Sequence, residues 1–126
     1  MKTLQIVDSA YRATLEEQDD TVVWLTHVLR GAGADLTLLL RGNAVNYAVA
    51  AQEPVALAIG DWTQSHPPSI AADLKGLRTK GVEIFAVKED LEDRGIVEGQ
   101  MIDSVAVVSR SRLADLVGGF QRVWHW

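Results

Sequence analysis

The sequence has 126 residues, of which 48% are hydrophobic and 23% are charged, a composition typical of a compact globular protein, and we expect a single domain over residues 1–126. Twelve Lys and Arg residues against 17 Asp and Glu residues give a net charge of −5, and because the cations are scattered, binding to nucleic acid is disfavoured. The chain contains no cysteine, which excludes disulfides, cysteine-ligated metals and thiolate nucleophiles.

The first predicted element is a strand at Leu4–Val7. This apolar run meets Asp8 and is too short for a secretory signal. No later segment reaches the roughly 18 uninterrupted apolar residues that are needed to cross a bilayer. We therefore expect a cytoplasmic protein without a membrane partner.

Helices and strands then alternate along the chain. The first helix has the helical spacing of Val22, Leu25 and Leu29, and its cap is Asp19, Asp20 or Thr21. Further strands are predicted at Leu36–Leu40, Val55–Ile59, Val82–Val87 and Val105–Val108. Further helices are predicted at Ala44–Ala51, from a first turn containing Pro67 and Pro68 to a stop at Gly81, at Glu89–Arg94 and at Arg110–Val117. This alternation predicts an α/β fold with a mainly parallel sheet and helices on both faces.

A ligand site is expected at one edge of this sheet, because open parallel sheets bind ligands beyond the carboxyl ends of their strands. The strand assignments place there Asp8, Ser9, Tyr11, Arg41, Gly42, Asn43, Asp61, Trp62, His66, Lys88, Asp90, Ser109 and Arg110. The ligand-binding residues that we expect from this set are Asp8, Tyr11, Arg41, Gly42, Asn43, Asp61, Trp62, His66 and Lys88. The histidines lack the spacing of a metal-binding helix, so no metal site is expected.

The group Arg41-Gly42-Asn43 is the most suggestive part of this edge. Gly42 permits a tight turn, Asn43 can cap the next helix, and free amides beside the Arg41 guanidinium can hold an anion. A turn and a cap with no ligand is the simpler alternative. In the turn-rich segment Gly60–Pro68, His66 is either a solvated loop histidine or a base near Asp61.

The C-terminus places two tryptophans within the last three residues. Alternation along a short edge strand puts Trp124 and Trp126 on one face and His125 on the other. The two indoles either pack onto the chain's own core or fill a groove of a neighbouring subunit as interface residues. The sequence leaves both alternatives open.

Three stretches resemble the DsrE/DsrF/DsrH superfamily, which includes the sulfur-relay subunits TusB, TusC and TusD. They are Leu38–Val45, a strand with a Gly-Asn turn and a helix; Gly81–Ile96, a strand with an acidic helix and Arg-Gly; and Arg122–Trp126, an aromatic terminal strand. The resemblance runs in order through most of the chain, and Gly81–Ile96 is its most specific part. It implies a three-layer α/β/α fold around a five-stranded parallel sheet, and assembly as a homotrimer, as a homohexamer or with a sister subunit.

The resemblance also assigns a role that this chain lacks. Val87 corresponds to the cysteine that carries persulfide in the relay members, and a valine cannot accept a sulfane sulfur, so thiol-based sulfur transfer by this chain is excluded. What remains implied is a non-catalytic subunit without a cofactor, which acts through oligomerisation or partner binding in intracellular sulfur metabolism. The alternative is a protein that binds an anion or a nucleotide at the strand ends. An enzyme that uses His66 with Asp61 or Lys88 is the least favoured hypothesis.

Overall fold

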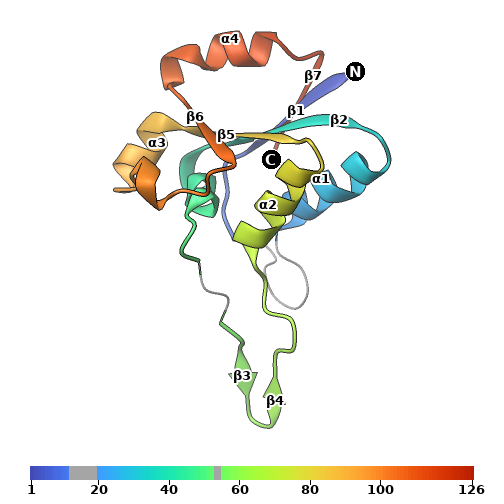
Figure 1. Cartoon of the computed structure of the whole chain (residues 1–126), viewed down its shortest axis with the longest axis vertical. Coiled ribbons are helices and arrows are strands. Elements are labelled where there is room, and N and C mark those ends of the chain that lie inside the picture. The colour runs from blue at the N-terminus through green and yellow to red at the C-terminus, as the bar shows by residue number, and fades with distance from the viewer. Residues whose placement is uncertain (12–19, 53–54) are drawn as a thin grey trace.

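Figure 1 shows the computed structural model, which describes residues 1–11, 20–52 and 55–126. The central sheet has five strands, all parallel, in the order β6-β5-β2-β1-β7. Their bounds are Lys2–Val7 for β1, Asp35–Leu40 for β2, Glu83–Val87 for β5, Val105–Val108 for β6 and Arg122–His125 for β7. The expected three-layer α/β/α fold with a mainly parallel five-stranded sheet is confirmed.

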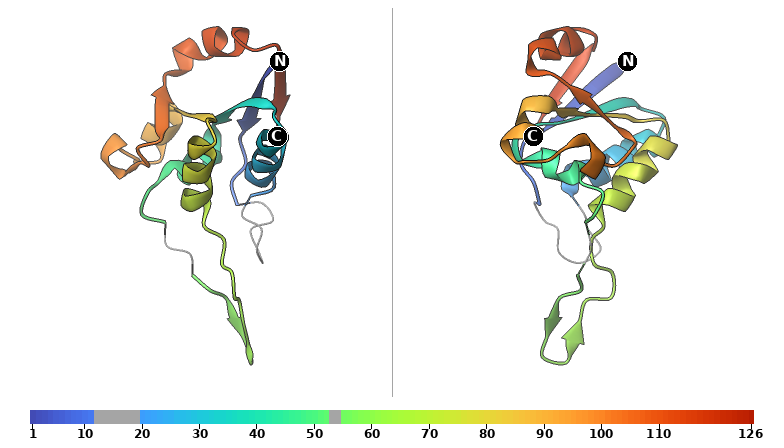
Figure 2. Two further views of the ribbon diagram at one scale, coloured as in Figure 1. Left: turned by 45° about the vertical axis from the view of Figure 1, so that its right-hand side comes forward. Right: turned by 60° about the vertical axis from the view of Figure 1, so that its left-hand side comes forward.

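Helices lie on both faces of this sheet. Helices α1 and α2 pack against one face, and α4 arches over the other, as the views in Figures 1 and 2 agree. The helix bounds are Thr21–Gly31 for α1, Ile70–Thr79 for α2, Lys88–Asp93 for α3 and Leu113–Gly118 for α4; short 3₁₀ helices are η1 at Gly42–Ala48, η2 at Glu98–Gln100 and η3 at Arg110–Arg112. In the part of the chain that the structure describes, no helix is both long enough and apolar enough to cross a membrane.

The apolar core is divided by the sheet into two clusters. The larger cluster lies on the side of α1 and α2 and includes Leu38, Leu40 and Tyr47. The smaller cluster, which includes Leu39 and Val87, packs under α4. Neighbouring residues of one strand enter opposite clusters because strand side chains alternate between faces. Burial on both faces explains why the strands read as nearly continuous apolar runs.

The predicted third sheet strand, Val55–Ile59, is wrong. Its last two residues, Ala58–Ile59, form β3, which pairs antiparallel with β4 at Trp62–Thr63 and is not hydrogen-bonded to the central sheet. The turn between them is Gly60-Asp61, and Gly60 has a φ of +58°, as the tight turn of a hairpin requires. An apolar run does not by itself distinguish a buried strand from an exposed one. The fifth place in the sheet belongs to β7, beside β1.

Helix α1 begins where the sequence predicts. The Asp20 carboxylate accepts hydrogen bonds from the backbone N–H groups of Val22 at 2.8 Å and Val23 at 3.1 Å, so Asp20 is the N-cap. Of the two other candidates, Thr21 is the first residue of the helix and Asp19 lies outside the described residues.

Two other helix starts differ from the prediction. Helix α2 begins at Ile70, so Pro67 and Pro68 precede it and do not occupy its first turn. Helix η1 begins at Gly42, so Asn43 lies inside it and does not cap it.

Candidate functional site

Three neighbouring strands bring a small cluster of charged side chains to the predicted edge of the sheet. Asp8 follows β1, Arg41 follows β2 and His125 ends β7. Arg41 Nε lies 3.5 Å from Asp8 Oδ1, and His125 Nε2 contacts Asp8 Oδ2. The sequence predicted Asp8 and Arg41 at this edge but missed His125, which is 117 positions away from Asp8 and meets it only because β7 lies beside β1.

The anion site predicted around Gly42 is occupied by a carboxylate of the chain itself. The Gly42 N–H, positioned by a φ of +51°, donates to Asp90 Oδ2 at 2.9 Å. Asp90 Oδ1 is bound in turn by the Arg110 guanidinium at 2.9 Å. Asn43 Oδ1 accepts from Arg94 Nη2 at 2.8 Å. Asp90 is therefore bound by Gly42 and Arg110, and Asn43 by Arg94.

Helix α3 adds further ion pairs to the same edge. Lys88, its first residue, pairs with Glu92 one turn later at 3.7 Å. The Glu89 carboxylate accepts the Arg110 backbone N–H at 2.7 Å, and this hydrogen bond lowers the pKa of Glu89. Both contacts lie on an exposed surface.

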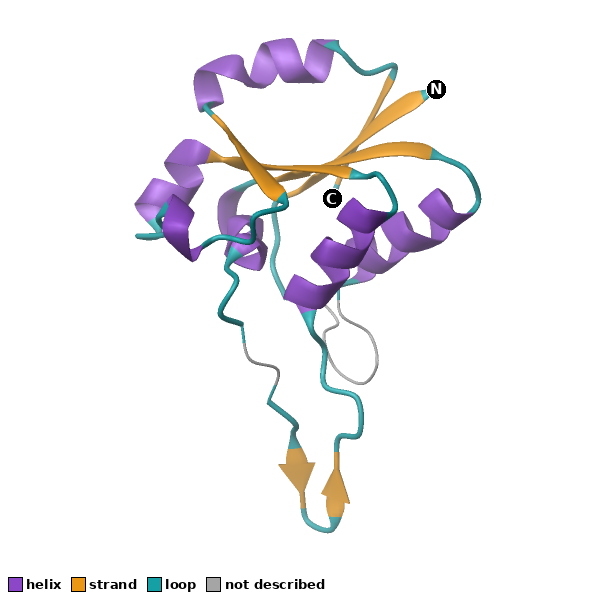
Figure 3. Ribbon diagram, viewed as in Figure 1, coloured by secondary structure: helices purple, strands orange, loops and turns teal. Residues whose placement is uncertain are grey.

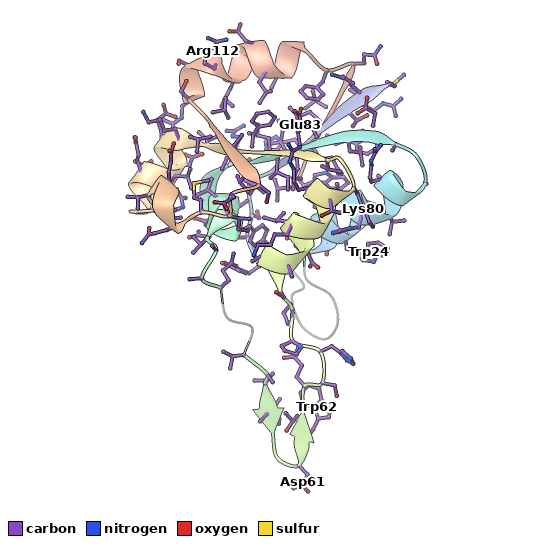
Figure 4. The ribbon with its side chains drawn as sticks, viewed as in Figure 1. Trp24, Asp61, Trp62, Lys80, Glu83 and Arg112 are labelled. Carbon is purple, nitrogen blue, oxygen red and sulfur yellow. The ribbon has the colours of Figure 1, made fainter. Side chains whose placement is uncertain are left out.

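Asp61 and Trp62 do not lie at the edge of the sheet that holds Asp8 and Arg41, which we call the rim. They lie at the far tip of the hairpin, away from the sheet, as Figure 4 shows. His66 lies in the segment between β4 and α2. The expectation that these residues follow a sheet strand fails because Val55–Ile59 is not one. Asp61 and Lys88 therefore do not share a site.

Tyr11 belongs to a buried polar chain that the sequence did not reveal. Its backbone has a φ of +58°, and its N–H donates to the hydroxyl of Tyr47, which is fully buried. That hydroxyl donates to Asp20 Oδ2 at 2.6 Å. Burial, with the hydrogen bond to Asp20, raises the pKa of Tyr47 far above its ordinary value. This series of hydrogen bonds links η1 to the cap of α1, so its role is structural.

Val87, which corresponds to the relay cysteine of the resembled family, is completely buried. Its side chain packs with Leu4, Ile6 and Leu39 under α4. A sulfur atom in this position would have no path to solvent or to a partner in this conformation. The position that the resemblance assigns to the thiol is therefore closed to solvent.

The hairpin carries several large apolar side chains that are exposed. We call residues 55–66 the arm; it extends away from the sheet, as Figure 3 shows. In the register of the hairpin, Ile59 and its partner Trp62 lie on one face, and Leu57 and Val55 precede them in the arm. Their exposed fractions are 64%, 47%, 49% and 81%. Contiguous exposed apolar side chains of this kind are found at protein and membrane interaction sites and in ligand-binding grooves.

A second apolar surface lies between α1 and the edge strand β7. We call it the α1–β7 groove; its volume is about 510 Å³, and it is lined by Leu25, Leu29, Val123, Trp124, His125 and Trp126. The indole N–H of Trp126 donates to Gln5 at 3.1 Å, which holds the tail on the sheet, yet 42% of Trp126 stays exposed. Trp24 of α1, labelled in Figure 4, is also exposed. The tryptophan tail is thus packed on its own chain and still presents apolar surface.

Comparison with known proteins gives matches among solved structures. No protein-family model matches the sequence, and no curated protein matches it. The YchN protein from E. coli superposes with a TM-score of 0.73 over 100% of both chains, at 23% identity. MTH1491 from Methanobacterium thermoautotrophicum, a protein of unknown function, superposes with a TM-score of 0.65 over 99% of this chain and 98% of its own, at 15% identity. The chain therefore has the fold of the DsrE-like proteins, the family that its sequence resembles.

Proposed function

We propose that this chain is a non-catalytic DsrE-like subunit that acts by assembling with further copies of itself or with a sister subunit. The observation that carries the proposal is the apolar face of the arm. A two-stranded hairpin is at best marginally stable alone in water, and among the described residues no third strand pairs with this one, whose large apolar side chains are exposed. Contact with another molecule supplies the missing layer.

The absence of a catalytic role is supported by two features of the chain. It has no cysteine, and the position of the relay cysteine is a buried valine. A link to intracellular sulfur metabolism rests on the family resemblance, and binding to a cysteine-bearing DsrE-like protein of the same organism is its direct test.

Sedimentation velocity over a range of concentrations tests the proposal. The wild-type chain is expected to exceed its monomer mass of 13.8 kDa. Replacing Ile59 and Trp62 by Ser is expected to weaken association at least about 100-fold, because each large apolar side chain contributes about 1.5–3 kcal/mol when buried. Both side chains are exposed in the monomer, so its unfolding temperature should not change.

A matched control uses an exposed valine elsewhere. Val97, at 61% exposure, lies outside the arm, and Val97→Ser should leave association unchanged. A wild-type chain that remains a monomer, alone and with its cysteine-bearing relative, would refute the proposed function.

A second candidate function, binding of a small anion at the rim, is favoured by the Arg41 side chain. It is 40% exposed, and its ion pair with Asp8 is long at 3.5 Å. Millimolar phosphate or nucleotide should then raise the melting temperature of the wild type but not of Arg41→Gln, because a ligand that binds the native state stabilises it. An unchanged melting temperature at millimolar ligand rules this function out.

A further inference from the structure

The arm and the α1–β7 groove have complementary chemistry but lie apart in the same chain. The arm leaves the body between η1 and α2 and points away from the sheet, as the two views of Figure 2 show. The groove, in contrast, is lined by residues of α1 and of the C-terminal segment that includes β7. A chain therefore cannot fill its own groove with its own arm. A second copy can.

We propose that the arm of one copy lies in the α1–β7 groove of a second copy, with Ile59 and Trp62 buried against Trp124. This inference deepens the proposed function and rests on it. Ile59 and Trp62 face each other in the hairpin register and so present one compact apolar unit. Pockets of about 300–1,000 Å³ hold drug-sized ligands, so a groove of about 510 Å³ accepts two such side chains.

Charge complementarity supports this choice of occupant. Asp61 stands at the turn of the hairpin between Ile59 and Trp62, so it accompanies them into the groove. The Arg122 guanidinium lies over the ring of Trp124, 5.8 Å from its centroid, and Arg122 is exposed; the groove is lined by Trp124. An arm seated with its apolar face on Trp124 brings the Asp61 carboxylate to the Arg122 guanidinium.

The open side of β7 gives the arm a backbone partner as well. Among the described strands, β7 pairs only with β1 and is an edge of the sheet. An edge strand presents backbone N–H and C=O groups that a strand from another molecule can pair with. One arm and one groove per copy then allow either a reciprocal exchange about a two-fold axis or a closed ring.

A charge-reversal series tests the contact. Asp61→Arg alone and Arg122→Asp alone should each weaken self-association roughly tenfold or more, since like charges then face each other in the interface. The double variant restores the opposite pairing and should associate within about threefold of the wild type. Asp93→Arg, which reverses an exposed carboxylate at the end of α3, is the control and should have no effect.

The outcomes separate this inference from the proposed function. If the wild type associates and loses association in the Ile59 and Trp62 variant, but the charge reversals have no effect or the double variant is not restored, the function stands and this docking site is wrong. If the wild type does not associate at all, both are wrong. Restoration in the double variant, with unchanged unfolding temperatures throughout, supports the docking site.

Discussion

Removing the hydroxyl of Tyr47 should destabilise the fold by an amount that its hydrogen bonds determine. Tyr47 is fully buried, and its hydroxyl donates to Asp20 Oδ2 at 2.6 Å and accepts the Tyr11 N–H. A hydrogen bond to a charged group contributes about 1.5–3 kcal/mol, and its loss leaves the Asp20 carboxylate, which is 1% exposed, short of a donor. Tyr47→Phe should therefore lower the free energy of unfolding by about 2 kcal/mol.

Urea denaturation measures this change, with an unchanged dependence on urea concentration as evidence that the unfolded state is the same. Asp20→Asn is the partner variant, because it keeps an oxygen for the cap of α1 but replaces the acceptor of the Tyr47 hydroxyl. If the two groups are coupled, Tyr47→Phe should cost at least about 1 kcal/mol less in the Asp20→Asn background. A loss below about 0.5 kcal/mol for Tyr47→Phe in the wild-type background would refute the argument.

Three further predictions concern the candidate site. The natural chain has no cysteine, so a single introduced cysteine can be followed with a thiol reagent. Because Val87 is buried and Val97 is exposed, Val87→Cys should react at least about 100-fold more slowly than Val97→Cys, and equal rates would show that position 87 is accessible. Gly42→Ala should lower the free energy of unfolding by about 1–2 kcal/mol, because φ is +51° there, whereas Gly99→Ala, with open space around it, should be neutral; equal effects would contradict this reasoning. An NMR titration should find the pKa of Glu89 below its ordinary value. The contribution of the Glu89 carboxylate to stability is then present at neutral pH and disappears as the pH falls through that lowered pKa. An ordinary pKa would mean that the hydrogen bond from the Arg110 N–H to Glu89 is absent in solution.

Much of the fold is predictable because most of the strands are buried on both faces. Leu36–Leu40 and Val82–Val87 are nearly unbroken apolar runs, and the structure places strands there. Val55–Ile59 has the same composition but is exposed, and only the two-residue turn before Trp62 distinguishes it as a hairpin. The composition of a segment shows that it is apolar, but whether the segment is buried depends on which other element of the fold packs against it.

The rim is predictable only in part, for a similar reason. Asp8 and Arg41 follow correctly predicted strands, so their placement at one edge follows from topology alone. The contacts of His125 with Asp8, and of Asp90 with Gly42, depend on which strands are neighbours and on how α3 is turned. Local sequence patterns do not contain that information.

Amide hydrogen exchange of residues 55–66, measured by mass spectrometry at low and high protein concentration, tests most directly whether another molecule covers the arm. The arm amides should exchange rapidly in dilute solution and become protected as the mass of the particle rises. Rapid exchange that persists while the mass increases would show that the chain assembles through another surface.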